Sequence, residues 1–142
     1  MITITLPFPP SVNHYWGRSG KRTFITTRGT RFREEVIYLC AKLKGYFPAD
    51  IRLSVEIDAY PPDNRRRDLD NLFKSLLDSL QHAGVYVDDN QIDKLLITRK
   101  SPNNGEVVVT MTKMVYLNNH QTQHQNTQDQ YPFSSPLCAP SL

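Results

Sequence analysis

Ten consecutive residues, 65–74, hold the side chains of this chain that could act on a phosphodiester. Three arginines in a row come directly before two carboxylates, Asp68 and Asp70, which are two residues apart. Carboxylates repel phosphates unless a metal ion lies between them, whereas arginines attract phosphates directly. A segment that contains both is what a metal-dependent enzyme acting on a nucleic-acid backbone requires.

Two further polar side chains belong to the same segment. Lys74 lies four residues after Asp70, so the two would share one face of a helix, where the ammonium could stabilise charge on an attacked phosphate. Asn71 could orient a ligand or contact the nucleic-acid backbone. We therefore predict that DNA is held by Arg65, Arg66, Arg67, Asn71 and Lys74.

A second acidic pair, Asp88 and Asp89, follows about one helix later. A helix of about fifteen residues spans roughly 22 Å, and a strand returning after Gly84 would bring this pair back beside the first. Three carboxylates would then converge on Mg²⁺, or on Mn²⁺ as a substitute, since hard cations prefer oxygen ligands. The candidate metal ligands are then Asp68, Asp70 and one of Asp88 and Asp89, and Lys74 could complete a catalytic set.

Each of these acids also has an ordinary structural explanation. Asp68 could cap a helix, Asp70 could interact with the helix dipole or pair with Lys74, and the second acidic pair could form a solvated turn. Three arginines beside two acids have no evident value for stability, since surface ion pairs contribute little. Their coincidence therefore favours a functional site. Tyr15 and Trp16 could stack on bases or pack in the core.

Hydrophobic periodicity predicts the elements that would position these residues. Strict alternation predicts strands over 2–6 and 53–59, and a wide apolar stripe predicts a helix over 69–83. A second helix is expected over 30–44, and residues 12–26 are expected to form an exposed loop or ribbon. Residues 85–87 favour a short strand, and the turn signal at 102–105 predicts a hairpin of strands 92–99 and 106–114. The order indicates a small α+β fold with two helices packed on a mixed sheet.

Composition limits the alternatives. All 17 Lys and Arg precede residue 114, together with 13 of the 14 acids, so that region carries a mild net charge of +4. Asn and Gln make up eight of the thirteen residues 118–130, and we predict a domain over 1–115 and a flexible tail over 116–142.

Cys40 falls on a predicted apolar stripe and is expected in the core. No membrane segment or signal peptide is recognised, so a cytosolic protein without a membrane partner is expected.

The same residues resemble the RusA family of Holliday junction resolvases, small endonucleases of phages and prophages. The resemblance rests on segment 65–74, on Val87-Asp88-Asp89, and on the opening Leu6-Pro7-Phe8-Pro9-Pro10-Ser11-Val12-Asn13, and it covers residues 2–114. It implies a RusA-like homodimer that binds four-way DNA junctions and makes paired, symmetric nicks with Mg²⁺, in a bacterial or phage-infected cell. It also implies that the catalytic acids are Asp68, Asp70 and Asp89 and that the catalytic lysine is Lys74.

The leading hypothesis is therefore a Mg²⁺-dependent endonuclease that resolves junctions in DNA recombination and repair. One rival is a junction-binding module of phage origin without catalysis, in which the acids serve only as caps. Another is the paired-aspartate metal site of a nucleotide-sugar transferase, although such folds are usually longer and would leave the arginines unexplained. The first rival predicts binding without metal-dependent nicking.

Overall fold

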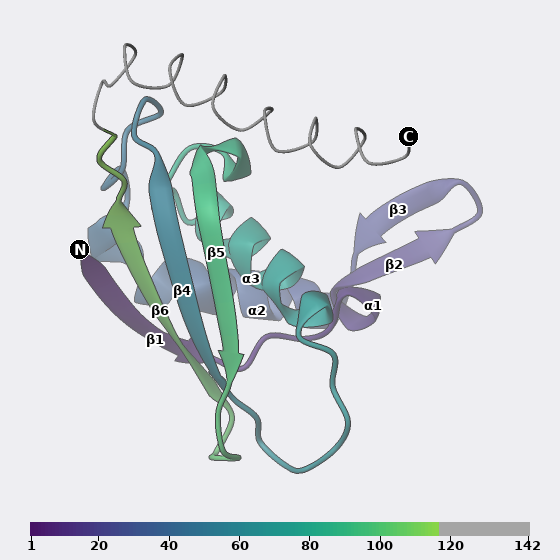
Figure 1. Ribbon diagram of the computed structural model, residues 1–142. Helices are drawn as coiled ribbons and strands as arrows, with labels where there is room; N and C mark the ends of the chain where they lie inside the picture. The colour runs from purple at the N-terminus through teal and green to yellow at the C-terminus, as the bar shows by residue number, and fades with distance from the viewer. Residues whose placement is uncertain (117–142) are drawn as a thin grey trace, which may run out of the picture.

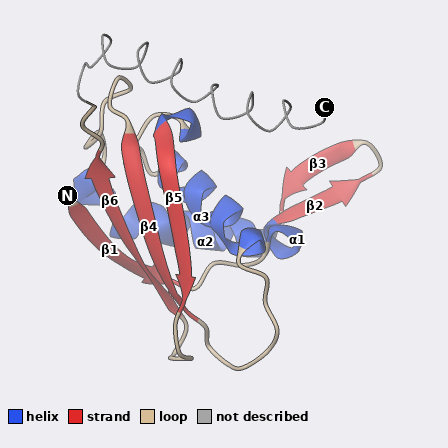
Figure 2. Ribbon diagram, in the orientation of Figure 1, coloured by secondary structure: helices blue, strands red, loops and turns tan. Residues whose placement is uncertain are grey.

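The computed structural model describes residues 1–116, which form a four-stranded mixed sheet covered on one face by helices, with a separate two-stranded ribbon (Figures 1 and 2). The spatial order of the main sheet is β1, β6, β4, β5. These strands are β1 (Ile2–Pro7), β6 (Glu106–Lys113), β4 (Leu53–Tyr60) and β5 (Ile92–Arg99). The predicted α+β class with a mixed sheet is confirmed.

Two long helices form the second layer, as predicted: α2 (Thr27–Leu39) and α3 (Asp70–His82). Short 3₁₀ turns follow each of them, η1 (Ala41–Leu43) and η2 (Asp89–Gln91). The region expected to be a loop or ribbon forms a one-turn helix, α1 (Val12–Tyr15), and then the antiparallel ribbon of β2 (Trp16–Ser19) and β3 (Arg22–Ile25).

The core lies between the sheet and the helices. Alternate residues of β4 are buried because this strand has neighbours on both sides and helices over one face; they are Leu53, Val55, Ile57 and Ala59. From α3, Leu76 and Leu80 fill the space opposite them. Cys40 is fully buried, as predicted, and burial raises the pKa of its thiol to about 11.

The predicted hairpin of the last two strands is wrong. β4 lies between them, pairing antiparallel with β6 and parallel with β5. The turn residues at 100–105 instead cross the end of β4, where Lys100 N–H donates to the Ala59 carbonyl and Asn103 N–H donates to the Pro61 carbonyl. Gly105 does form a turn, at a φ of 87°, but this turn carries the chain across β4 from β5 to β6. The parallel pair is linked through α3, as parallel strands require.

The short strand expected at 85–87 is also absent from the described chain. Gly84, at a φ of 77°, ends the α3 segment, and Val85 and Tyr86 then enter the core instead of joining a sheet. Residue types common in strands, such as Val and Tyr, are also common at buried positions, and here Val85 and Tyr86 are buried without forming a strand.

The chain leaves the sheet beside the start of β5. The Tyr116 hydroxyl donates to Asp93 Oδ2 at 2.6 Å, so the first residue of the predicted tail is tied to the fold. The rest of that predicted tail, 117–142, lies outside the described residues. Among the described residues, none of the helices has the length and apolar character needed to cross a membrane.

Candidate active site and DNA-binding groove

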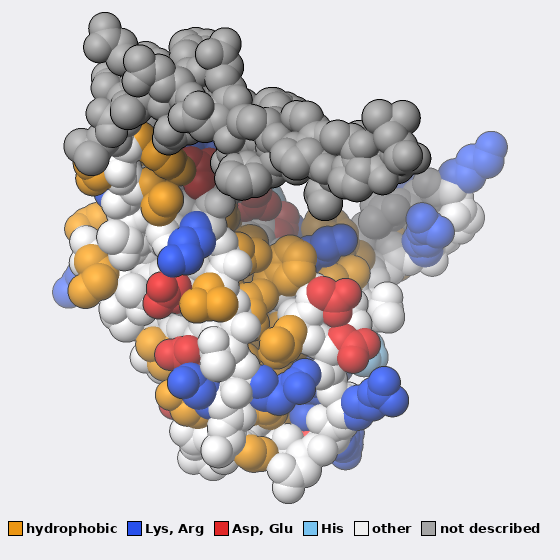
Figure 3. All heavy atoms as spheres, in the orientation of Figure 1, with side chains coloured by type: hydrophobic (Ala, Val, Ile, Leu, Met, Phe, Trp, Pro, Cys, Tyr) orange, Lys and Arg blue, Asp and Glu red, His pale blue; other side chains and the backbone are white. Residues whose placement is uncertain are grey.

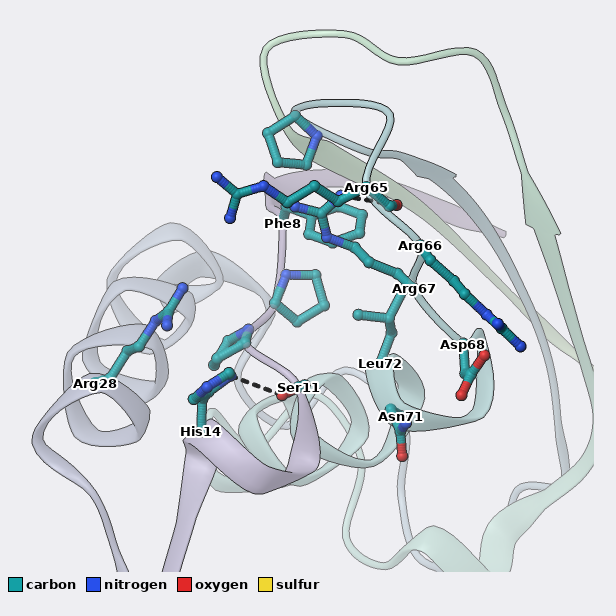
Figure 4. Close-up of a pocket in the computed structure, with 13 residues that line it drawn as sticks. Phe8, Ser11, His14, Arg28, Arg65, Arg66, Arg67, Asp68, Asn71 and Leu72 are labelled. Atoms are coloured by element: carbon teal, nitrogen blue, oxygen red, sulfur yellow. Dashed lines mark hydrogen bonds between the residues drawn. The ribbon is translucent and has the colours of Figure 1, made fainter.

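A groove of about 580 Å³ runs between the proline turn after β1 and the arginine loop before α3 (Figure 4). Pro9 and Pro10 are buried and form part of its floor, and Leu72 from α3 closes it from below. The groove is lined by Phe8, Pro9, Pro10, Ser11, His14, Arg28, Pro62, Arg65, Arg66, Arg67, Asp68, Asn71 and Leu72. A segment that follows β1 thus meets one that follows β4, and sequence distance gives no hint of this.

Asp63 gives the arginine loop its shape. Its carboxylate accepts from Arg67 Nη1 at 2.6 Å and from the Arg65 backbone N–H at 2.9 Å. The hydrogen bond from Arg67, followed by the Arg65 backbone bond, lowers the pKa of Asp63 to about 2. An exposed loop of like charges is therefore organised around one carboxylate that stays ionised.

The three arginines do not play equal parts. Arg67 lies with its guanidinium 5.7 Å from the centre of the Phe8 ring, and its carbonyl accepts from Arg99. Arg65, in contrast, has a side chain that is 83% exposed and extends over the groove, while Arg66 is also exposed and extends on the side of Asp68 (Figure 4). Arg67 is held by the fold, whereas Arg66 and most of the Arg65 guanidinium face solvent, although Arg65 Nε lies 3.7 Å from Asp63 Oδ2.

Asp68 and Asp70 lie at the start of α3 without protein partners. Both are exposed, and within residues 1–116 neither carboxylate accepts a hydrogen bond or forms an ion pair. The capping explanation for Asp68 is wrong, because Leu69 precedes the helix in a helical conformation and no side chain caps it. Asp70 occupies the first turn, where the helix dipole favours an anion, but it does not pair with Lys74.

Asp88 and Asp89, at the other end of α3, are both engaged. Asp88 caps η2 by accepting from Asn90 N–H at 3.0 Å, and the Gln91 side chain completes a capping box. Asp89 Oδ1 lies 2.6 Å from the hydroxyl of buried Tyr86, which also lies 2.7 Å from the Leu77 carbonyl. Burial, and then this bond to Asp89, raise the pKa of Tyr86, so the phenol remains a proton donor.

The predicted convergence of three acids is not found within one chain. Tyr86 tethers Asp89 beside Leu77, which is seven residues, or about 10 Å of helix axis, beyond Asp70. Accordingly, no group of three or more His, Cys, Asp or Glu in the described part of the chain is placed to hold a metal ion. The parallel β4–α3–β5 connection explains this separation, since it leaves the residues after α3 away from the start of the helix.

The donor chemistry at the start of α3 nevertheless suits Mg²⁺. This cation usually binds one or two carboxylates and completes its coordination with water and substrate phosphate oxygens. Asp68 and Asp70 supply two exposed carboxylates with no competing partner among residues 1–116, next to arginines that would hold the phosphate. Lys74, one turn beyond Asp70, is exposed and free of ion pairs within residues 1–116.

Sequence reasoning missed the opposite wall of the groove. Arg28 projects from the first turn of α2, and His14, from α1, bonds to Ser11 at 2.9 Å (Figure 4). Neither residue belongs to a periodic or motif-like pattern, so the sequence held no signal for them. Base stacking by Tyr15 is wrong because this side chain is fully buried, with Trp16 edge-on at 5.1 Å.

Together, a basic groove and two unengaged carboxylates at its edge define the type of site found in nucleases. The family model for the endodeoxyribonuclease RusA matches residues 7–112, which include every residue of this site. The chain therefore belongs to the RusA endodeoxyribonuclease family and is a nuclease.

Named relatives agree over most of the chain. A crossover junction endodeoxyribonuclease of Enterobacteria phage HK97 is 45% identical over 94 residues, covering 66% of this chain and 78% of the relative. The enzyme of the same name from Shigella sonnei is 34% identical over 113 residues, covering 79% and 94%. That of Enterobacteria phage 82 is 38% identical over 116 residues, covering 78% and 93%.

Proposed function

We propose that this protein is a Mg²⁺-dependent endonuclease that resolves four-way DNA junctions by paired, symmetric nicks in recombination and repair. The observation that carries the proposal is the pair of unengaged carboxylates, Asp68 and Asp70, beside the exposed guanidinium groups of Arg65 and Arg66. The relatives are named crossover junction endodeoxyribonucleases, which supports a junction as the substrate.

The chain's own residues divide the work of the reaction. Arg65 and Arg66 bind backbone phosphates along the groove, and Arg67 contributes its remaining donors while Asp63 holds the loop in place. Asn71 lines the groove and contacts the DNA backbone. Lys74 places a positive charge one turn beyond Asp70, where it stabilises negative charge on the attacked phosphate.

Asp68 and Asp70 would hold the cation. When bound, Mg²⁺ neutralises charge at the scissile phosphate and makes water a stronger nucleophile. Hydrolysis joins a water oxygen to phosphorus and breaks one P–O ester bond, while the water loses a proton and the departing oxygen takes one up. Without a cation, the two carboxylates repel the phosphate that the arginines attract, which couples productive binding to the metal.

A homodimer belongs to the proposal because two symmetric nicks require two sites related by a two-fold axis. The edge strand β5 offers a surface for a second copy: within the described residues it pairs only with β4, and Leu95 and Leu96 are 37% and 49% exposed. Long apolar edge strands are usually protected by charge or cover in monomers.

Such a dimer also suggests how Asp89 contributes. Antiparallel pairing of β5 with its symmetry copy reverses the strand direction, so the start of one β5 lies near the end of the other. Arg99, at the end of β5, donates to the carbonyl of Arg67, the residue before Asp68. The partner's Asp89, which precedes its β5, would therefore approach the Asp68–Asp70 pair, whereas the Asp89 of the same chain is about two helical turns away.

The test is a cleavage assay with the purified full chain. We would incubate it with a labelled four-way junction of immobile core and with linear duplex, in Mg²⁺ and in EDTA. Metal-dependent paired nicks on the junction alone are the expected result. Tight junction binding without nicks in Mg²⁺ or Mn²⁺, over several junction sequences, would instead support the non-catalytic binding module.

A further inference from the structure

The projecting β2–β3 ribbon carries positive charge that the proposed active site does not use (Figures 1 and 3). Arg18, Lys21 and Arg22 lie at its tip and are exposed, and none of them forms an ion pair within residues 1–116. The first 33 residues contain six Lys and Arg and no Asp or Glu, so no acid in this stretch of sequence offsets the charge. The ribbon is therefore an unpaired basic surface outside the groove.

The root of the ribbon is fixed to the body of the protein. The carbonyl of buried Tyr15 accepts from both the backbone N–H and the hydroxyl of Thr26, which closes the ribbon at its base. The Tyr15 hydroxyl donates to Asp78 of α3, and Arg33 of α2 pairs with the same carboxylate at 2.8 Å. Gly29 allows α2 to approach, since a Cβ there would lie 2.5 Å from the Tyr15 carbonyl oxygen.

The ribbon itself is stiffened by one aromatic side chain. Phe24 covers its cross-strand partner Gly17, where a Cβ would come within 2.6 Å of the ring. An isolated two-stranded ribbon is marginally stable in water. The fixed root and this ring hold the charged tip away from the body in a defined direction.

Positive charge points from both faces of the ribbon. Arg18 pairs with Thr23 and Ser19 with Arg22, and neighbouring cross-strand pairs face opposite sides, so Arg18 and Arg22 lie on opposite faces with Lys21 in the turn. A surface for a flat partner would gather its charges on one face. A duplex groove has phosphates on both sides, and the major groove of B-DNA, about 12 Å wide, admits a two-stranded ribbon.

The ribbon is connected at both ends to elements that line the groove of the active site. His14 and Arg28, which line that groove, flank the ribbon in sequence on α1 and α2. We propose that the ribbon lies in the major groove of one duplex arm of the bound DNA and that Arg18, Lys21 and Arg22 contact backbone phosphates on its two strands. This inference rests on the proposed DNA substrate and adds a second contact region to it.

The first test measures salt dependence of binding, in EDTA so that cleavage plays no part. Fluorescence anisotropy gives the Kd of a labelled four-way junction from 50 mM to 400 mM salt, for the wild type and for the double variant Lys21→Gln/Arg22→Gln. Each lost phosphate contact lowers the slope of log K against log salt by about 0.9, so we expect a loss of roughly 1.8. If the two lines meet near 1 M salt, binding at 0.1 M weakens by roughly 60-fold.

A matched control removes two positive charges elsewhere. Lys42 and Lys113 are exposed, and Lys113 pairs with Leu53, at the opposite end of β4 from the groove. Lys42→Gln/Lys113→Gln is expected to keep the wild-type slope. The proposal is overturned if the ribbon variant also keeps that slope, or if the control variant loses as much.

The second test locates the ribbon on the DNA. A photoreactive aryl azide is attached to Ser19→Cys in a Cys138→Ser background, where buried Cys40 is protected from labelling. Cross-links to paired nucleotides within a duplex arm are expected, with none from the same label at Lys113→Cys. Cross-links confined to the branch point, or their absence, would overturn the placement.

The two proposals can fail separately. A wild-type chain that binds junctions without nicking them contradicts the proposed nuclease activity, while the salt slope and the cross-links still decide the role of the ribbon. A chain that nicks junctions and shows neither ribbon effect keeps its proposed function and loses this inference.

Discussion

The two ends of α3 each carry a pair of aspartates, and the fold treats them in opposite ways. At the C-terminal end, Asp88 caps a 3₁₀ turn and Asp89 accepts from a buried tyrosine. At the N-terminal end, Asp68 and Asp70 have no hydrogen-bond or ion-pair partner within the described residues. The two aspartate pairs look similar in sequence, but only the carboxylates of Asp68 and Asp70 have both oxygens free of bonds within the described residues.

The difference separates acids that form bonds within the fold from acids that form none within the described residues. An exposed carboxylate beside arginines contributes little to folding stability, which supports the proposal that Asp68 and Asp70 bind a cation. Asp89 has one oxygen engaged by Tyr86, which holds the carboxylate in place and leaves the other oxygen available. In the second pair, therefore, Asp88 has a structural role as a cap, and Asp89 is held in place by Tyr86 with one oxygen still available.

The largest effect is expected for Asp70→Asn. Loss of this carboxylate should reduce junction cleavage by more than the roughly 100-fold that loss of an outer-shell metal partner costs. Junction binding in EDTA should stay the same or tighten, because a negative charge facing phosphate is removed. The matched control is Asp88→Asn, which makes the same charge change and preserves capping, since Asn is also a good N-cap. If the two variants are folded and lose cleavage equally, then Asp70 and Asp88 do not differ in function and the prediction is wrong.

A large effect is also expected for Leu96→Lys on the edge strand. A lysine on an edge strand blocks pairing with another chain, so light scattering should show the mass of a monomer in place of a dimer. Cleavage should fall as the dimer is lost. Ile37→Lys, on α2 and 41% exposed, serves as the control and should remain dimeric. If Leu96→Lys keeps the wild-type mass, β5 is not the interface.

An intermediate effect is expected for Tyr86→Phe, which frees Asp89 from its tether. Cleavage should fall by about 10- to 100-fold, the range for partners that orient metal ligands. Stability should fall by about 1–2 kcal/mol, since the buried hydroxyl proton that Asp89 and the Leu77 carbonyl share is lost. Tyr15→Phe removes a similar buried hydroxyl, which bonds to Asp78 and to none of the three acids. Chemical denaturation measures the loss of stability in both variants, and single-turnover assays measure the loss of cleavage. A similar loss of cleavage in both variants would contradict the idea that Tyr86 positions Asp89 for catalysis.

The smallest effect is expected for the pH dependence of the arginine loop. Hydrogen bonding to Arg67 lowers the pKa of Asp63 from 3.8 to about 2. Because the folded pKa is lowered, the stabilisation is present above about pH 4 and is lost as the pH falls through about 2. Wild type and Asp63→Asn should therefore differ in stability near neutral pH and converge towards pH 2. A carboxyl signal of Asp63 titrating near pH 4 in an NMR experiment would contradict the bond.

Much of the fold could be predicted because burial leaves a period in the sequence. The alternation in β4 and the apolar stripe of α3 follow from which side chains face the core, and both elements were predicted nearly to their ends. The pairing of β5 and β6 could not be predicted in the same way. Turn residues at 102–105 indicate only that the chain changes direction. The same signal fits a hairpin or a crossover over β4, and the structure has the crossover.

The site was predicted in part for a similar reason. Asp68, Asp70 and the arginines are adjacent in sequence, so their proximity needed no knowledge of the fold. The distance of Asp89 from Asp68 and Asp70 could not be predicted, because it depends on the direction of the crossover through α3. Arg28 and His14 reach the groove from separate elements, and proximity of that kind arises only from tertiary packing.

The most direct test of the contrast between the two ends of α3 is paramagnetic broadening by Mn²⁺ in the NMR spectrum of the labelled full-length protein. The backbone amide signals of residues 68–71 should broaden at the lowest Mn²⁺ concentrations. That broadening should disappear in Asp70→Asn and persist in Asp88→Asn. If Asp70→Asn keeps it, or if Asp88→Asn loses it, then the unengaged pair at the start of α3 does not hold the metal and the account is wrong.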